Sequence, residues 1–226
     1  MTMIANNLQR VRNRIAAACS ARGRAPEAIT LLAVSKTFDA AAVRLAHAAG
    51  QSAFGENYIQ EAVEKMAALS DLPLQWHCIG PIQSNKTRLV AQHFDWVHTV
   101  DRLKTAQRLS DQRPPTLAPL QVCIQVNIDG GPTKAGVAPE AALELARQIQ
   151  RLPHLRLRGL MTIPEPAADF AGACAVHTRA RALWDALNAQ GLQLDTLSMG
   201  MTADVEAAVQ CGSTMVRVGS AIFGRR

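Results

Sequence analysis

The chain has 226 residues, of which 48% are hydrophobic and 19% charged, a balance typical of a globular protein that argues against extensive disorder. Its net charge of +6 suits an anionic partner, either a nucleic acid or a small phosphate ester. Aromatic residues make up only 4% and are not interleaved with basic ones, so we expect no nucleic-acid partner. No apolar run approaches the roughly 18 residues of a membrane span, so we expect no membrane association.

The N-terminal segment, residues 1–25, predicts a helix that packs on the rest of the protein. Ile4, Leu8, Val11 and Ile15 fall on one helical face. The many arginines before Glu27 also resemble a transit peptide, but a retained outer helix is the simpler interpretation.

Apolar strand-like runs then alternate with helical segments along the chain. The eight runs are TLLAVSK, SAFGEN, QWHCIG, DWVHTV, LQVCIQVNI, LRLRGLMTI, DTLSMGM and STMVRVGSAIFG. Helical spacing marks residues 39–50, 58–69, 101–113, 139–151, 168–190 and 203–211. The alternation predicts an α/β protein with a parallel sheet, namely a single-domain (β/α)8 TIM barrel over residues 1–226. A doubly wound open sheet is the competing architecture.

Cysteine usage indicates the compartment. The cysteines are odd in number and widely spaced, which predicts reduced thiols, a cytoplasmic location and no disulfide framework. Neither they nor the histidines show a metal-binding spacing, so no metal site is expected. The five positions are Cys19, Cys78, Cys123, Cys174 and Cys211.

Lys36 closes the first apolar run, Leu31 to Val34, where a charged amine needs a reason. A buried amine is pushed towards its neutral form, and a neutral amine attacks an aldehyde to form a Schiff base. A lysine that reaches solvent from a strand end, or pairs with a carboxylate, is the alternative with about equal weight.

Two turns rich in small residues follow the last two strands, where barrels commonly bind phosphate. The first contains Ser198, Gly200 and Thr202, and the second contains Gly219 and Ser220. Each turn alone favours an ordinary tight turn or helix cap, but the two together favour a phosphate site.

Arg217 alternates with two valines in the last strand, so its side chain is expected inside the barrel, facing either a ligand or a buried carboxylate. Asn57 follows the second strand and is expected either to cap a helix or to contact a ligand. The glycine-bearing segment 126–137 is a candidate lid over the barrel mouth.

Seven segments, in order from about Leu31 to Gly224, resemble the YggS/PROSC family of pyridoxal phosphate homeostasis proteins: AVSKTF, FGENYIQE, IGPIQSNK, VNIDGGPTKAGV, LRGLMTIP, LSMGMTADVEAAV and STMVRVGSAIFG. Thr202 stands where the family pattern has serine. The resemblance implies a barrel like the N-terminal barrel of alanine racemase, called PLP fold type III, that holds pyridoxal 5'-phosphate (PLP).

The resemblance also implies roles for individual residues. Lys36 is expected to form the Schiff base, while Ser198, Gly200, Gly219 and Ser220 hold the phosphate and Arg217 and Asn57 face the cofactor. The family implies a monomeric cytoplasmic carrier that buffers PLP or delivers it to apo PLP-dependent enzymes, without catalytic residues. Whether Lys134 or Lys86 takes part in transfer stays open.

A small PLP-dependent amino-acid racemase is the alternative function. An arginine against the cofactor's ring nitrogen discourages protonation there and so weakens carbanion chemistry. A racemase needs acid–base groups on both faces of its substrate, and Tyr58 is the only tyrosine of the chain. These points favour the carrier.

Overall fold

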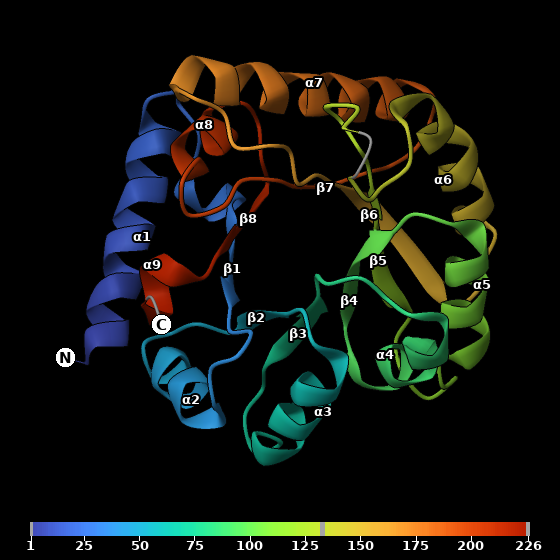
Figure 1. Ribbon diagram of the computed structural model, residues 1–226, viewed down its shortest axis with the longest axis horizontal. Coiled ribbons are helices and arrows are strands. Elements are labelled where there is room, and N and C mark those ends of the chain that lie inside the picture. The colour runs from blue at the N-terminus through green and yellow to red at the C-terminus, as the bar shows by residue number, and fades with distance from the viewer. Residues whose placement is uncertain (1, 132–133, 225–226) are drawn as a thin grey trace.

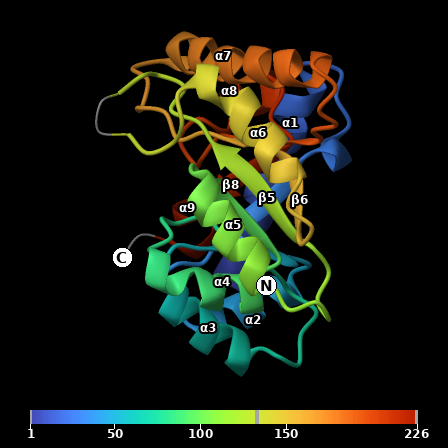
Figure 2. The same ribbon diagram turned by 90° about the vertical axis from the view of Figure 1, so that its right-hand side faces the viewer.

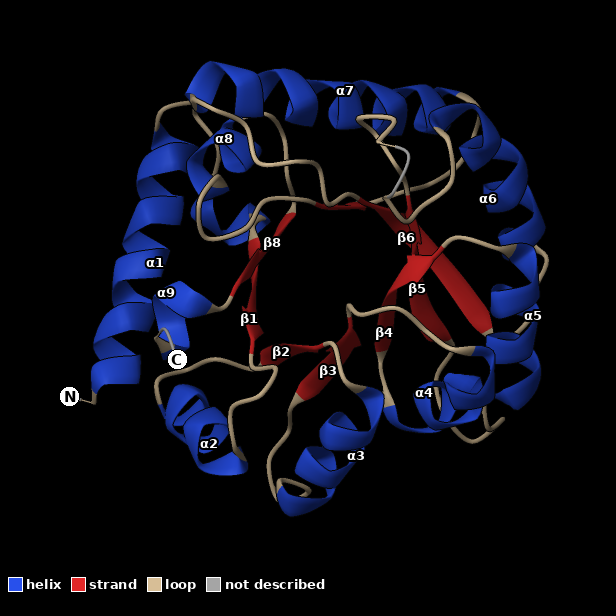
Figure 3. Ribbon diagram, viewed as in Figure 1, coloured by secondary structure: helices blue, strands red, loops and turns tan. Residues whose placement is uncertain are grey.

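Eight parallel strands close into a barrel in which each strand pairs with the next and β8 pairs with β1 (Figures 1 and 3). The computed structural model describes residues 2–131 and 134–224. The predicted (β/α)8 barrel is thereby confirmed, and the open sheet is excluded. The strands are β1 (Thr30–Val34), β2 (Ala53–Glu56), β3 (Gln75–Cys78), β4 (Trp96–Val100), β5 (Leu120–Gln125), β6 (Leu155–Met161), β7 (Thr196–Ser198) and β8 (Met215–Val218).

Helices surround this barrel and cover its outer surface (Figure 1). Short 3-10 helices at Pro26–Ala28, Ser84–Lys86 and Pro139–Ala141 precede β1, α4 and α6. The α-helices are α1 (Met3–Ser20), α2 (Ala40–Ala48), α3 (Ile59–Ala68), α4 (Thr87–His93), α5 (Leu103–Gln112), α6 (Ala142–Gln150), α7 (Phe170–Ala189), α8 (Val205–Gln210) and α9 (Ser220–Phe223).

Local sequence explains where several helices begin. The Asp39 carboxylate accepts a hydrogen bond from the Ala42 N–H (2.8 Å) at the start of α2, and Asp169 accepts one from Gly172 (2.7 Å) at the start of α7. Both are N-caps, which satisfy backbone donors that have no partner within the helix. The apolar faces of the helices then pack on the outward-facing side chains of the strands in one continuous core.

The last predicted strand is wrong in its second half. The run STMVRVGSAIFG contains β8 only as far as Val218, and residues 220–223 form the short helix α9, whose N-cap is Gly219. A segment of four residues is too short to carry a period that separates strand from helix, so the sequence pattern could not place this change.

The N-terminal helix α1 packs beside α8 and α9 on the outside of the barrel (Figure 1). Arg14 forms an ion pair with Glu206 (2.6 Å) and also donates a hydrogen bond to the Thr202 carbonyl (2.9 Å). The Asn7 amide donates to the Ile222 carbonyl (2.9 Å). Side chains of α1 therefore contact both the segment after β7 and the segment after β8.

All strands run towards one face of the barrel, from which the segment after β5 projects (Figure 2). Pro132 and Thr133 of the candidate lid lie outside the described residues. In the described part of the chain, no helix combines the length and apolar character required to cross a membrane. All five cysteines are free thiols.

Candidate cofactor-binding site

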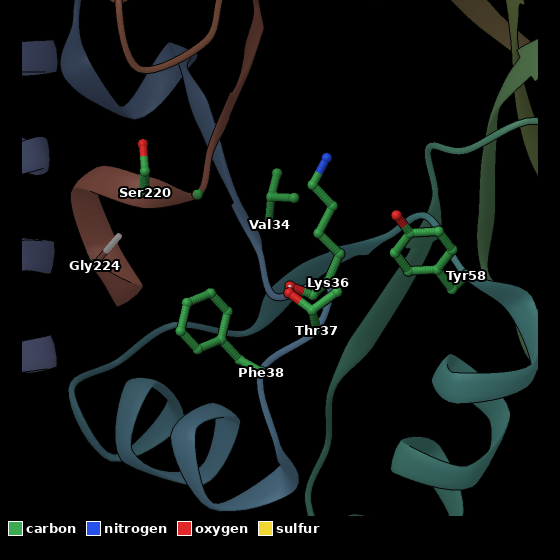
Figure 4. A pocket seen from close by; sticks show the side chains of 8 residues that line it. Val34, Lys36, Thr37, Phe38, Tyr58, Ser220 and Gly224 are labelled. Carbon is green, nitrogen blue, oxygen red and sulfur yellow. The ribbon is translucent and has the colours of Figure 1, made fainter. Parts of the chain in front are cut away.

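A cavity of 320 Å3 opens where β1 and β8 end, at the C-terminal face of the barrel (Figure 4). This volume is at the lower end of the range for small-molecule sites. The lining combines one amine, two hydroxyl side chains, a phenol and apolar groups. Its residues are Val34, Lys36, Thr37, Phe38, Tyr58, Gly219, Ser220 and Gly224.

Lys36 lies in this cavity but not inside a strand, so the sequence argument needs a correction. Strand β1 ends at Val34, and Lys36 belongs to a turn in which Thr37 adopts a positive φ of 68°. The lysine side chain is exposed and extends between Val34 and Tyr58 (Figure 4). The expectation of a neutral amine rested on burial of this lysine, and the Lys36 side chain is not buried in this structure.

Lys65, on α3, is the buried lysine that the sequence analysis missed. Its amine lies 2.6 Å from the Glu56 carboxylate, 3.2 Å from Glu61 and 2.9 Å from the Ser35 carbonyl. Burial raises the pKa of Glu56 despite the neighbouring lysine. Ile59, Ala62 and Lys65 recur at three-residue intervals on one helix face, a signal that could have located it.

These charged residues hold both neighbours of Lys36. The Ser35 hydroxyl donates to Glu56 (2.6 Å), and the Thr37 N–H donates to Glu61 (2.6 Å). The peptide groups on either side of Lys36 are thereby anchored to α3, and the Ser35 side chain is anchored to β2. The backbone of the turn is fixed while the lysine side chain stays free to meet a ligand.

The hydroxyls of Ser220 and Thr202 lie 3.5 Å apart. Because Ser220 lines the cavity that also contains Lys36, a phosphate bound by the two hydroxyls would lie at the edge of the same cavity. Thr202 belongs, with Ser198 and Gly200, to the first of the two small-residue turns that the sequence singles out, although the family resemblance assigned it no phosphate contact.

Gly200 and Gly219 allow close packing at these turns. Gly200 has φ of +94°, and a Cβ on it would lie 2.3 Å from the Cβ of Ala208. A Cβ on Gly219 would lie 3.2 Å from the Val34 carbonyl oxygen. The glycines therefore bring α8 and β1 close to the two turns, while their predicted contact with phosphate stays a prediction.

Ser198 and Arg217 are brought together inside the barrel. Arg217 donates to the Ser198 hydroxyl (2.8 Å) and to the Thr162 carbonyl (2.8 Å), and Ser198 also contacts His98 (3.0 Å). The Ser198 side chain is fully buried and its hydroxyl accepts from Arg217, while its predicted contact with phosphate stays a prediction. For a phosphate at the cavity, the hydroxyl of Thr202 is better placed.

Arg217 is only 4% exposed, and its hydrogen bonds to Ser198 and Thr162 lie inside the barrel, where the sequence analysis expected this side chain. Burial lowers its pKa to about 10, which still leaves the guanidinium charged at neutral pH. Two of its five N–H groups bond to Ser198 and Thr162, so donors remain for a ligand.

Asn57 follows β2, and its amide oxygen is buried without a hydrogen-bond partner among the described residues. A Cβ on Gly80 would lie 2.3 Å from the Asn57 carbonyl oxygen, so the glycine is needed for this close approach. The unpaired amide oxygen is suited to a ligand that donates a hydrogen bond.

The two other lysines considered for transfer are not among the residues lining the cavity. Lys134 pairs with Glu165 at 3.0 Å, beyond β5 and β6. Lys86 lies at the end of the 3-10 helix before α4. Their roles in transfer stay open.

The residues present fit a phosphorylated aldehyde. An amine, a pair of hydroxyls and an unpaired amide oxygen supply a nucleophile and polar partners, and a buried arginine lies on the adjacent strand. The fold and the candidate site together define a (β/α)8 barrel with a lysine-bearing cavity at the C-terminal ends of its strands.

Comparisons with known proteins agree with this architecture. A family model described as alanine racemase, N-terminal domain, matches residues 3–226. The chain is 59% identical over 226 residues to the pyridoxal phosphate homeostasis protein of Pseudomonas aeruginosa, covering 100% of this chain and 97% of that protein. The Escherichia coli K12 protein of the same name is 52% identical over 229 residues, covering 100% of this chain and 98% of that protein.

A solved structure of PipY from Synechococcus elongatus PCC7942 with PLP bound superposes with a TM-score of 0.83 at 39% identity, covering 98% of this chain and 100% of that one. The chain therefore belongs to the family of pyridoxal phosphate homeostasis proteins.

Proposed function

We propose that this protein binds PLP and acts in its homeostasis as a carrier in the cytoplasm. The main observation that supports this proposal is that the Lys36 amine and the Ser220 hydroxyl line one cavity, with the Thr202 hydroxyl beside Ser220. The PLP bound to the related PipY and the names of the bacterial relatives support the same ligand.

In this proposal the Lys36 amine attacks the PLP aldehyde and water leaves, which gives a Schiff base. Ser220, Thr202 and the turn at Gly219 hold the phosphate, Asn57 lies at the edge of the site and Arg217 faces the ring. Because Lys36 is exposed, water or the amine of another protein can reach the same carbon and displace the lysine. Reversible exchange suits delivery of PLP to apo enzymes by a monomeric carrier.

The charged arginine supports a carrier without turnover. PLP supplies an electron sink when its ring nitrogen is protonated. Arg217 is charged at neutral pH and can only donate hydrogen bonds, so it favours the unprotonated nitrogen and a weaker electron sink.

Borohydride reduction followed by mass spectrometry tests the proposal directly. PLP-loaded protein should absorb visible light, and reduction should fix one cofactor on the peptide that contains Lys36. Lys36→Ala should lose both the absorbance and the label, whereas Lys104→Ala, at an exposed position on α5, should keep both. A label on another lysine, or a wild-type protein that takes up no PLP, would overturn the proposal.

The racemase alternative is favoured by one observation. Tyr58 lines the same cavity as Lys36 and lies across it in Figure 4, so two acid–base groups face the same space. This reading predicts exchange of the Cα proton of an amino acid with solvent deuterium, faster than with free PLP and slowed in Tyr58→Phe. Exchange no faster than with free PLP would remove this alternative.

A further inference from the structure

A column of hydrogen-bonded polar side chains runs through the barrel, where (β/α)8 barrels usually pack branched apolar residues. It begins at Gln75, at the start of β3, and ends at Arg217 in β8. The His77 ring contacts Gln75 Oε1 through Nε2 (3.0 Å) and His98 Nε2 through Nδ1 (2.9 Å). His98 Nδ1 then lies 3.0 Å from the Ser198 hydroxyl, which accepts from Arg217.

The donor and acceptor of every hydrogen bond in this column follow from its Arg217 end. Arginine can only donate, so the Ser198 oxygen accepts from Arg217 and its own proton is free for His98 Nδ1. With Nδ1 accepting, a neutral His98 carries its proton on Nε2 and donates to His77 Nδ1. His77 in turn carries its proton on Nε2 and donates to Gln75 Oε1.

The opposite arrangement satisfies fewer groups. His98 would aim an N–H at a serine oxygen that already accepts from Arg217, and the serine proton would lose its acceptor in the column. Gln75 would also have to present its amide nitrogen to His77 in place of Oε1. With the other protons placed as above, an imidazolium on His77 would place two N–H donors against each other at 2.9 Å. An imidazolium on His98 would aim its Nδ1–H at the donating Ser198 hydroxyl at 3.0 Å.

The dipoles of the column stabilise the Arg217 cation in place of a negatively charged partner. No carboxylate among the described residues forms an ion pair with Arg217, and its two acceptors, the Ser198 hydroxyl and the Thr162 carbonyl, are neutral. With the protons placed as above, the negative end of each dipole in the column points towards the guanidinium. The cation is stabilised while its charge is not cancelled by an opposite one.

We propose that His98 and His77 are positioning residues that, through Ser198, orient Arg217 and keep its charge available to the cofactor site. The Trp96 ring stacks on His77 with centroids 5.2 Å apart and fixes the plane of that imidazole. The consequence for the cofactor rests on the proposed function above. The arrangement of protons is a property of the protein without PLP.

Nitrogen NMR of the protein without PLP, with its histidine rings labelled with nitrogen-15, tests where the protons of the column lie. Both rings should be neutral with the proton on Nε2, and a scalar coupling across the hydrogen bond should connect His98 Nε2 to His77 Nδ1. Signals are assigned with His77→Gln and His98→Gln. An Nδ1-protonated tautomer, an imidazolium at neutral pH, or the absence of the coupling would overturn the proposal even if PLP binds.

PLP titration of two matched variants tests the positioning role. Ser198→Ala removes the link between Arg217 and His98 and should weaken PLP binding by about tenfold, with a changed circular dichroism of the cofactor. Ser213→Ala removes another fully buried hydroxyl, which contacts only backbone carbonyls, and should bind PLP within about twofold of wild type.

Wild-type binding combined with an unchanged Ser198→Ala variant would overturn the positioning role alone. Equal losses in both serine variants would assign the effect to packing and would also overturn it. Failure of the wild type to bind PLP would overturn the proposed function and with it this effect on the cofactor, while the NMR result would still decide the arrangement of the column.

Discussion

Arg217 in β8 is buried and hydrogen-bonded through both terminal nitrogens, whereas Lys36, just after the neighbouring β1, is exposed. The arginine is held through its own side chain by neutral groups inside the barrel. The lysine is held only through its neighbours Ser35 and Thr37, by the charged residues Glu56, Glu61 and Lys65. In the proposed function, the group that orients the cofactor is enclosed, and the group that reacts with the aldehyde is left open.

Acidification should weaken the interior column, and this is the largest effect that we expect. Burial lowers the pKa of His77 from 6.5 to about 3, so between these values the unfolded chain binds a proton that the folded chain does not. Stability is therefore lost as pH falls through that window, by roughly 5 kcal/mol when the whole shift is realised. His98 acts in the same direction.

Urea unfolding between neutral pH and about pH 4 measures this loss. His77→Gln should reduce the slope of the unfolding free energy against pH. His93→Gln, at an exposed position in the last turn of α4, should leave the slope unchanged. An equal slope in wild type and His77→Gln would contradict the burial of a neutral imidazole.

Lys65→Met should break the support of the Lys36 turn. The substitution leaves the fully buried Glu56 carboxylate without its cation, which costs about 3–5 kcal/mol of unfolding free energy. Adding Glu56→Gln should recover much of this loss, and Lys104→Met on the surface should change little. A loss below about 1 kcal/mol in Lys65→Met would mean that the ion pair does not support the turn.

The smallest effect should come from Thr37→Gly. Thr37 has φ of 68°, a conformation that costs a residue with a side chain about 1–2 kcal/mol, partly offset by the greater freedom of glycine when unfolded. We expect a gain of about 0.5–1 kcal/mol in thermal or urea unfolding. Thr37→Ala keeps the strain and should show no gain; a loss in Thr37→Gly would indicate that the turn is unstrained.

Sequence periodicity located all eight strands because clear helical spacing separates most of the apolar runs. It could not fix where β1 ends, since Ser35 and Lys36 continue the run while the backbone turns at Thr37. The expected burial of the lysine failed for this reason. Lys65 was overlooked because a lysine on an amphipathic helix is usually solvent-exposed.

The column of His77, His98 and Ser198 lay beyond the sequence for a different reason. Barrel strands are buried on both faces, so alternation groups residues on one face without saying which face is inside. Contacts between β4, β7 and β8 also depend on the stagger of the closed barrel, because Ser198 meets His98 across the interior from a non-neighbouring strand.

The contacts of α1 connect this outer helix to the two segments that carry the Thr202 and Ser220 hydroxyls. None of its residues lines the cavity. However, Arg14 donates a hydrogen bond to the Thr202 carbonyl, and Asn7 donates one to the Ile222 carbonyl in α9, the helix that begins at Ser220. Detaching this helix would loosen both hydroxyl-bearing segments at once. By linkage, a ligand bound by these two segments should stabilise the packing of α1 and protect residues 3–20 from a protease. The rate at which α1 is cleaved would then report how much of the protein carries the cofactor.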